Sequence, residues 1–378
     1  MSHFCAPIIM SIAAISTSLP AQQPFPIPTI LKSAPAPDWN AKFANTEGWI
    51  GGDVVASVAL SPKRILWLFG DTLLGTVKEA KRPGAKMVNN TLGIMDGLGK
   101  DATIRFVAGK AKDNSPAAFL IPGDGKGWFW PQSGIRVGDR LFIFLPQIEK
   151  TKDSGVFGFK LVAQWLAIVE NPDAEPEKWQ VKQHKIPFGE FKPHRERSWG
   201  SAALEENGHV YVFGYDHDRG KKGSTRKLIV ARAPVKQFDD FTAWRFFTSK
   251  GWCDKPADSA PLADGLATEF TVGRLPGGKG FVTVYTEIGL SDRILGRFSN
   301  ALEGPWSDPV LLYKCPEMAK DKGVFSYAGK AHAWAANGNE LLLSYCVNTW
   351  DFARLFREND VYRPKFVRVT LGAPPLMD

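Results

Sequence analysis

One hairpin unit recurs five times along this chain, and no other feature of the sequence constrains the fold as strongly. Each unit opens with small or polar residues, forms a short strand, turns at Gly, Asn, Asp or Pro, and closes with an aromatic-rich strand. The last aromatic residue of each second strand lies 60 to 75 residues after its predecessor. These five residues are Phe69, Phe144, Phe213, Tyr285 and Tyr345. Self-similarity at such intervals indicates an array of similar supersecondary units.

Further strand-like segments follow the hairpins, as in "LVAQWLAIV" of the second unit and "KLIVARAPV" of the third. Five units of about four strands each predict an all-β, five-bladed β-propeller with a central axial pocket. The 13 Trp, 36 Gly and 27 Pro residues agree with a fold made of pleated sheets and many turns. A pair of β-sandwiches or another mixed β protein is the alternative.

The first 44 residues differ in character from the rest of the chain. Residues 1–21 hold a short apolar stretch followed by small residues, which predicts a secretory signal peptide. Residues 22–44 are rich in proline and predict an extended lead-in to the propeller, which we expect at 45–378. Because the apolar stretch is too short to span a membrane, we expect a secreted or periplasmic protein.

The charge of the chain is distributed rather than concentrated. The net charge of +8 arises from 47 basic and 39 acidic residues, with small basic clusters at 194–197 and 219–227. These clusters are expected to be solvated loops, and the alternative is affinity for an anionic polysaccharide. Since no long basic tract is present and Trp is plentiful, we expect a monomer with a carbohydrate partner and no nucleic-acid partner.

The first hairpin, at 49–72, carries an acid near each open end, Asp53 and Asp71. An antiparallel hairpin brings its two open ends together, so both carboxyl groups are expected at one sheet edge. The innermost strands of a propeller line its axis, which makes this edge the mouth of the pocket. Counting back from each turn gives equivalent strand starts at Asp53, Gln132, Ser201, Glu269 and Lys330.

Asp53 and Glu269 lie in units that are not adjacent, so they can face each other across the pocket. Two such carboxyl groups suit glycoside hydrolysis, in which one protonates the leaving oxygen and the other activates water or attacks the sugar. Asp71 either tunes the pKa of this pair or is a structural partner of its own turn. For each acid, the alternative is an ion pair with a neighbouring Arg or Lys.

Several other residues near the strand ends are candidates for binding sugar. Tryptophans can stack on a sugar ring, with core packing as the alternative, and polar side chains can bind its hydroxyl groups. The candidates are Trp49, Trp130, Trp199, Asn90, Gln132, Asp216, Lys330 and His332. His332 is otherwise a buried histidine or an axial metal ligand. We expect no cofactor and no protein metal site, with an axial calcium ion as the alternative.

Five segments together resemble a known group of proteins. They are "GGDVVASVAL…ILWLFGDT", "WPQSGI", "WGSAALEENGHVYVFGYD", "EFTV" and "SNALEGPWSDPVLLY". The chain resembles bacterial five-bladed propeller glycosidases over roughly residues 45–371, nearest to an uncharacterised domain family that includes endo-D-arabinanases. It is more distantly similar to the arabinanase, β-xylosidase and levansucrase propellers.

The resemblance implies roles for particular residues. In the distant propellers, an Asp that opens the first inner strand is the base or nucleophile, which matches Asp53, and a Glu on a later inner strand is the acid, which matches Glu269. The family's middle, pKa-tuning Asp is replaced here by Gln132 and Ser201, so the resemblance implies Asp71 or Asp216 as its substitute. A cation held on the axis by a histidine in some of these proteins would correspond to His332.

The sequence thus predicts an exported glycoside hydrolase that acts on an arabinan-like or acidic glycan. The first alternative is a propeller that binds carbohydrate without cleaving it. The second is a glycoside phosphorylase, whose phosphate cradle would use Lys330, Arg293 and Arg297. A weaker alternative is a polysaccharide lyase built on Tyr327, His332 and Arg363.

Overall fold

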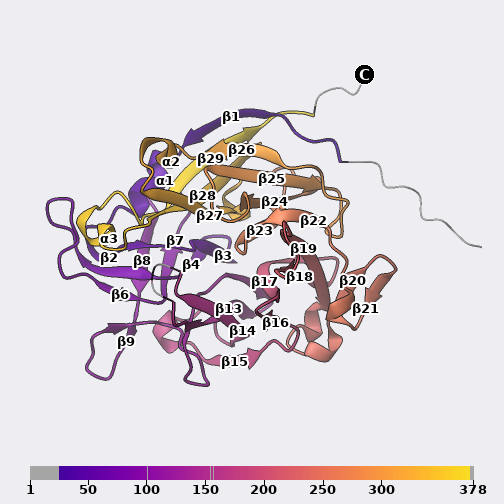
Figure 1. Cartoon of the computed structure of the whole chain (residues 1–378), viewed down its shortest axis with the longest axis horizontal. Helices are drawn as coiled ribbons and strands as arrows, with labels where there is room; N and C mark the ends of the chain where they lie inside the picture. The colour runs from indigo at the N-terminus through magenta and orange to yellow at the C-terminus, as the bar shows by residue number, and fades with distance from the viewer. Residues whose placement is uncertain (1–24, 100, 154, 156, 375–378) are drawn as a thin grey trace, which may run out of the picture.

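The computed structural model describes residues 25–99, 101–153, 155 and 157–374, and within them the protein is built from antiparallel sheets (Figure 1). The signal peptide predicted at 1–21 lies outside the described residues. The α-helices are single turns or little more: α1 (Pro37–Lys42), α2 (Glu317–Lys320) and α3 (Arg354–Arg357). Among the described residues, no helix has the length and apolar character needed to cross a lipid bilayer. The predicted all-β class is confirmed.

Four sheets contain a meander in which each strand pairs with the strand that follows it within that sheet, although in the first sheet β5 and β6 intervene along the chain and belong to another sheet. The first has β3 (Ala56–Ser61), β4 (Arg64–Phe69), β7 (Thr91–Asp96) and β8 (Thr103–Val107). The second has β12 (Ser133–Val137), β13 (Arg140–Lys150), β14 (Phe159–Val169) and β15 (Val181–Lys185), with β11 (Trp128–Phe129) beside β13. The third has β17 (Arg195–Glu206), β18 (His209–Asp218), β19 (Arg226–Pro234) and β20 (Arg245–Thr248), extended by β16 (Glu190–Lys192), β21 (Gly251–Cys253) and β22 (Ala263–Leu266). The fourth has β23 (Phe270–Arg274), β24 (Phe281–Thr286), β25 (Arg293–Ser299) and β26 (Val310–Lys314).

A further sheet joins the two ends of the described chain. It contains β27 (Val324–Ala331), β28 (Glu340–Thr349), β29 (Lys365–Leu371) and β1 (Ile30–Pro35), in that order. The register of β1 on β29 runs from Ile30 opposite Leu371 to Pro35 opposite Val367. Part of the Pro-rich segment is therefore the outer strand of this sheet, where proline is tolerated because an edge strand leaves some N–H positions unpaired.

Two smaller sheets complete the fold: β2 (Glu47–Gly52), β5 (Thr72–Thr76) and β6 (Lys86–Val88), and the pair β9 (Gly109–Lys110) and β10 (Pro116–Ala117). The expected single hairpin at 49–72 is thus divided, because β2 pairs with β5 whereas β3 pairs with β4. Asp53 lies in the connection between β2 and β3, not at the first residue of a strand. The reason is local, since Val54 and Val55 have φ angles of 67° and 52°, which no strand can contain.

The first strands of the meanders lie next to one another in chain order. β3 packs on β12, β12 on β17, β17 on β23, and β23 on β27. Because each sheet has neighbours on both faces, its middle strands are apolar on both sides, as in β4, where Ile65 to Phe69 are all buried. Separate apolar clusters fill the spaces between sheets, one of them joining Leu66 and Leu68 of β4 to Ile143 and Leu145 of β13.

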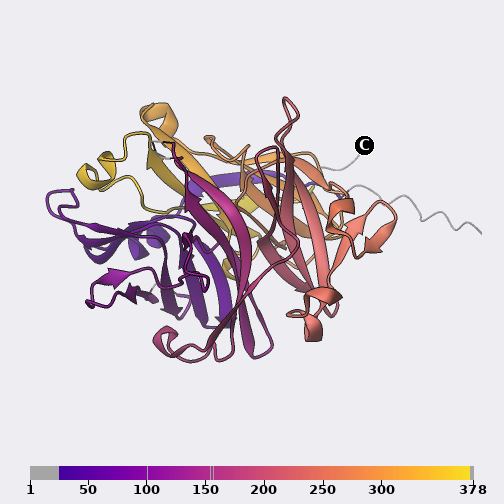
Figure 2. The same ribbon diagram turned by 60° about the horizontal axis from the view of Figure 1, so that its bottom comes forward.

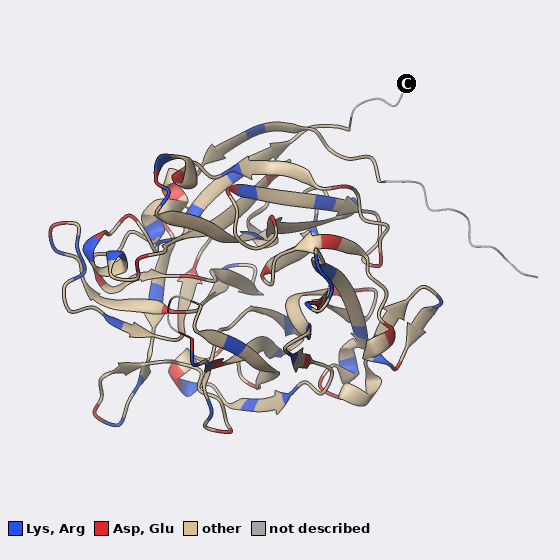
Figure 3. Ribbon diagram, viewed as in Figure 1, with Lys and Arg blue, Asp and Glu red and all other residues tan. Residues whose placement is uncertain are grey.

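Basic and acidic residues are spread over all of these sheets, in agreement with the scattered charge of the sequence (Figure 3).

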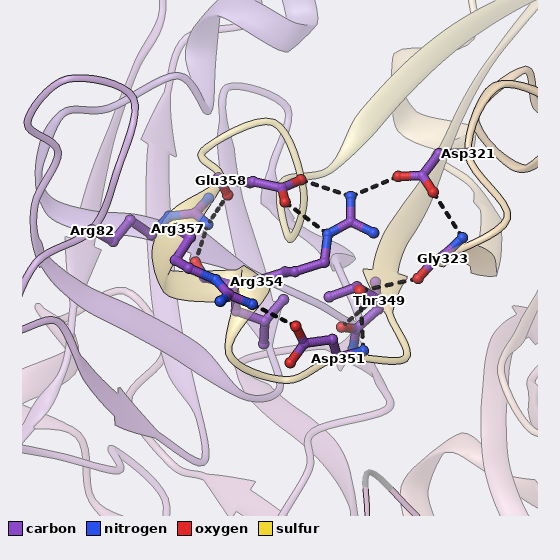
Figure 4. Close-up of polar contacts among 10 residues, drawn as sticks. Arg82, Asp321, Gly323, Thr349, Asp351, Arg354, Arg357 and Glu358 are labelled. Carbon is purple, nitrogen blue, oxygen red and sulfur yellow. Dashed lines mark hydrogen bonds and ion pairs between the residues drawn. The ribbon is translucent and has the colours of Figure 1, made fainter.

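A buried arginine fixes the connection between β28 and β29. The guanidinium group of Arg82 donates to five carbonyl oxygens, and four of them lie in this connection, at Leu355, Glu358, Asn359 and Val361. Figure 4 shows Arg82 beside Glu358. The fifth acceptor is the carbonyl of Ile50 in β2. Each N–H of the guanidinium group therefore has an acceptor, which satisfies a buried cation without a carboxylate.

A second arginine holds the same connection from the solvent side. Arg354 forms paired bonds of 2.7 Å to both carboxylate oxygens of Glu358 and a 2.6 Å contact to Asp321 (Figure 4). Asp321 in turn accepts from the N–H of Gly323, whose carbonyl accepts from Thr349 at the end of β28. The segment 350–362 is thereby fixed at both of its ends.

We expect Arg82→Met to lower the free energy of unfolding by at least about 3 kcal/mol, because it removes the donor of five carbonyl groups, of which those of Ile50, Leu355 and Val361 are buried. Arg357→Met is the matched control, since Arg357 lies in the same connection but is exposed and has a single surface ion pair with Asp351. That variant should stay within about 1 kcal/mol of the wild type in urea unfolding. Equal losses in the two variants would contradict the role given to Arg82.

Candidate active site

Three carboxyl groups from different parts of the chain come together at the strand ends. Asp53 precedes β3, Asp71 lies between β4 and β5, and Glu269 comes directly before β23. The pKa of Asp53 is raised well above its usual range, first because burial removes it from water and then because Asp71 and Glu269 place negative charge beside it. Protein atoms surround Asp53, yet all three residues keep partial contact with solvent. The acids are recessed but open to a ligand.

The backbone holds Asp53 and Asp71 side by side. The N–H of Asp53 donates to the carbonyl of Asp71 at 3.3 Å, and the N–H of Gly70 donates to the carbonyl of Asp53 at 3.1 Å. A side chain at Gly70 would place its Cβ 2.5 Å from Oδ1 of Asp53, so only glycine fits. The left-handed φ angles of Val54 and Val55 store strain beside this contact, as is common where a structure fixes a functional side chain.

Two tyrosines fix the Asp53 carboxyl group. The hydroxyl groups of Tyr327 and Tyr362 donate to the same oxygen, Oδ2, at 2.8 and 3.1 Å. Burial and the charge of Asp53 raise the pKa of both tyrosines, so both stay protonated and remain donors. Oδ1 has no side-chain partner in the described part of the chain, which makes it the oxygen that can hold a proton.

Asp71 accepts two hydrogen bonds on Oδ1, from Trp130 Nε1 at 2.8 Å and from Asn89 Nδ2 at 3.2 Å. These bonds lower its pKa, but burial outweighs them and raises the pKa to about 6. Asp71 therefore changes charge close to neutral pH. Trp130 contributes its N–H to the site, while its ring packs edge-on against Phe159.

Glu269 forms an ion pair with Lys330 of β27, with 2.9 Å between Oε1 and Nζ. The lysine side chain is only 1% exposed, whereas that of Glu269 is 21% exposed. β27 has a bulge between Tyr327 and Lys330, which turns Tyr327 toward Asp53 and Lys330 toward Glu269. The bulge in β27 thus places a hydrogen-bonding partner beside each of two acids, Asp53 and Glu269.

Gln132 and Ser201 lie beside Glu269 and bind backbone. Gln132 Nε2 donates to Ser201 Oγ and to the carbonyl of Thr268, and Ser201 Oγ donates to the same carbonyl. Thr268 directly precedes Glu269, so these bonds fix the segment that carries the acid. Gln132 and Ser201 stand at the two positions where the resemblance implies an Asp that tunes a pKa. An uncharged hydrogen-bond network therefore takes the place of that carboxylate.

Asn89, Tyr327 and Tyr362 reach the acids, although sequence reasoning did not assign any of them to the site of hydrolysis. It chose Asn90, whose amide instead binds the backbone of Leu120 and Phe129 in the interior. Consecutive residues of an extended chain point to opposite sides, so an error of one position exchanged the two asparagines. The sequence "VNNT" contained the signal but not which of the two residues would face the acid.

His332 is buried, and both of its ring nitrogens have partners. Nδ1 lies 2.7 Å from Ser57 Oγ, and Nε2 lies 2.8 Å from Ser344 Oγ. Burial, aided by the charge of Lys330, lowers the pKa of His332 to about 3, so the ring is neutral. No nitrogen is left to bind a cation, and the described residues contain no group of His, Cys, Asp or Glu arranged to hold a metal ion.

The remaining candidates lie away from the acids or in the interior. Trp49 and Trp199 are core residues, packed on Phe106 and Phe246 respectively. Asp216 is bound by Arg195 at 2.8 Å and by Arg197 at 2.6 Å. Together with basic and polar residues of the 221–227 loop, Asp216 lines a surface cavity of about 410 Å³ over the third sheet.

These features define an all-β protein whose meander sheets bring three carboxyl groups together at their strand ends. The chain belongs to the family described as "Domain of unknown function (DUF5005)", whose model matches residues 37–371. No curated protein matches the sequence.

Solved structures with a similar fold come from several organisms. A protein of Bacteroides ovatus, assigned provisionally as a hydrolase, superposes with a TM-score of 0.72 at 18% identity, over 89% of this chain and 90% of that one. This likeness shows a shared fold. A GH43_1 enzyme from Xanthomonas citri gives 0.48 at 12% identity, over 91% of each chain. The Podospora anserina α-L-arabinofuranosidase PaAbf62A, in complex with cellotriose, gives 0.45 at 9% identity, over 85% and 92%. The last two scores are too low to carry an argument.

Asp71→Asn should stabilise the protein at neutral pH. The pKa of Asp71 is about 6 in the folded chain and near 3.8 when unfolded, so its ionisation costs stability as the pH rises through this window. We expect the variant to be more stable at pH 7.5 by up to about 3 kcal/mol, with the difference vanishing near pH 3.5. Thermal unfolding at both pH values measures it. Asp38→Asn is a control of opposite sign, because Arg368 lowers the pKa of Asp38. A pH-independent effect of Asp71→Asn would contradict the assignment.

Proposed function

We propose that this protein is a glycoside hydrolase that cleaves an arabinan-like or acidic glycan with the carboxyl groups of Asp53 and Glu269. The observation that carries the proposal is the contrast between the two acids. Asp53 sits where burial and two neighbouring carboxylates favour its protonated form, whereas Glu269 lies against a buried ammonium group. A buried carboxyl group that keeps its proton is suited to act as the acid of a glycosidase, and a second carboxylate held in place by a cation can act as its partner.

In this proposal Asp53 is the general acid and Glu269 is the base or nucleophile. Asp53 holds its proton on Oδ1 and passes it to the leaving glycosidic oxygen, while Tyr327 and Tyr362 keep Oδ2 in place. Asp71 is ionised above pH 6, and its charge keeps Asp53 protonated. These roles are the reverse of those that the resemblance implies, and the reason is the position of Lys330 beside Glu269.

We propose further that the five large sheets are the blades of a five-bladed propeller and that the acids line its axial pocket. The order in which the first strands pack on one another supports this arrangement. A hydrogen bond between Ser57 of β3 and His332, just after β27, also supports it, because it links the first sheet to the last.

Asp53→Asn and Glu269→Gln should each lower kcat/KM by about 10²–10⁴-fold while leaving the fold intact. Release of reducing ends from linear arabinan, arabinoxylan and polygalacturonate measures turnover. Glu287→Gln is the matched control, because Glu287 is also a partly exposed carboxylate near a strand end but is ion-paired to Arg293. Full activity in both site variants would end the proposal.

The pH profile of Asp71→Asn distinguishes the two assignments of acid and base. If Asp53 is the acid, activity falls as the pH rises through its pKa, and removal of the Asp71 charge moves this high-pH limb to lower pH. If Asp53 is the base, the same substitution moves the low-pH limb instead. We expect the first result in profiles of kcat/KM between pH 4 and 10.

A carbohydrate-binding protein without hydrolytic activity is the second candidate. The ion pair between Glu269 and Lys330 favours it, because a carboxylate held by lysine can bind and position sugar without taking part in cleavage. Binding of the same glycans without release of reducing ends would select this candidate. A phosphorylase is less well supported, since Arg293 and Arg297 are already paired with Glu287 and Asp264.

We also propose that the chain is exported, which rests on the apolar stretch and small residues of 1–21. N-terminal sequencing of the mature protein, after expression with its leader, should locate a cleavage site near residue 21. An intact Met1 would contradict export by this route.

A further inference from the structure

A row of aromatic rings connects the second sheet to the sheet that contains β27 and β28. β13 and β14 are eleven residues long, and Phe157 lies in the connection between them. The ring of Phe157 is 6.1 Å from Phe325 of β27 and 5.9 Å from Trp350, which follows β28. Phe325 and Trp350 are themselves 4.5 Å apart. The long strands of this hairpin rise toward the C-terminal sheet in Figure 2. We call Phe157, Phe159, Phe325 and Trp350 the aromatic bridge.

Both ends of the aromatic bridge contact the residues that bind the aspartates. On one side Phe325 lies 5.6 Å from Tyr327, whose hydroxyl donates to Asp53. On the other side Phe159 lies 4.7 Å from Trp130, whose indole N–H donates to Asp71. The rings therefore run continuously from the support of one aspartate to the support of the other.

Two members of the bridge expose large apolar surfaces to solvent. Trp350 is 50% exposed and Phe157 is 49% exposed, and they are in contact with each other. Among the described residues only one other large aromatic is as exposed, Phe352, which packs on Phe356 and not on the bridge. Adjacent exposed aromatic rings form an apolar patch of the kind that marks a binding surface.

Trp350 is held in a fixed position. The backbone N–H of Trp350 donates to the carbonyl of Gly323. Gly323 belongs to the Arg354–Asp321 network that fixes the segment 350–362 (Figure 4). A preordered ring loses little conformational freedom when a ligand stacks on it. Rigid aromatic faces next to carboxyl groups are suited to a sugar ring, which offers C–H groups on its face and hydroxyl groups at its edge.

We propose that Trp350 and Phe157 form a subsite that stacks against a sugar residue of the glycan next to the bond at Asp53 and Glu269. This inference rests on the proposed function for the position of the glycan, but it concerns binding and does not require cleavage. The chemical class of its ligand is a saccharide unit with an apolar face. The subsite accounts for the length of β13 and β14, which carry Phe157 to Trp350.

The test measures binding in the Asp53→Asn background, where turnover cannot consume the ligand. Affinity electrophoresis in gels that contain linear arabinan, arabinoxylan or polygalacturonate gives a dissociation constant for each polymer. Trp350→Ala and Phe157→Ala should each weaken binding about tenfold, the loss expected for one stacked aromatic ring. Phe352→Ala is the matched control, because Phe352 is about as exposed as Phe157 and Trp350 and lies in the same connection as Trp350. This variant should bind as the parent does. All three side chains are half exposed, so the variants are expected to fold.

The outcomes separate this inference from the proposed function. Weaker binding in both bridge variants but not in Phe352→Ala supports the subsite, whether or not the wild type cleaves the polymer. Cleavage by the wild type together with unchanged binding in the bridge variants overturns the subsite and leaves the hydrolase proposal standing. Equal loss in all three variants also overturns it, because the effect would then follow general surface hydrophobicity. If the wild type neither binds nor cleaves any of the three polymers, both the subsite and the hydrolase proposal are overturned.

Discussion

The five hydrogen bonds of the Arg82 guanidinium group determine where the second half of the site lies. They join β2 to the connection that precedes Tyr362, and the carbonyl of Tyr362 then accepts from the N–H of Gly52 next to Asp53. Burial and the nearby Arg363 lower the pKa of Arg82 to about 10, which still leaves it charged at neutral pH. Without this cation, the residue before Tyr362 loses its hydrogen bond to the interior, and the segment that carries Trp350 loses its inner attachment.

The supports of the acids also come from other parts of the fold than the acids themselves. Tyr327 and Lys330 of β27 bind Asp53 and Glu269, and Trp130, beside the second sheet, binds Asp71. The electrostatics of the site is therefore a property of the assembled sheets, not of any one hairpin.

The sequence allowed the all-β class, most strands and the meeting of Asp53, Asp71 and Glu269 to be predicted, because turn residues and alternating apolar runs are local signals. It did not predict that Asp53 lies outside β3, since the unusual φ angles of Val54 and Val55 exist only under constraint from Gly70 and Asp71. The ion pair of Glu269 could not be foreseen either, because the bulge in β27 sets the direction of Lys330. Trp49 and Trp199 show that position near a strand start does not decide between core and surface, which depends on the neighbouring sheet.

The pairing of β1 with β29 brings residues that are more than 330 positions apart into one register. The four meander sheets can form from local contacts as the chain emerges, but the last sheet cannot gain its outer strand until β29 has been synthesised. During that interval β1 is an unpaired strand, and the edge of β28 that β29 later covers stays open to other chains. The late arrival of one C-terminal strand thus sets the period in which the nascent protein is most vulnerable to aggregation.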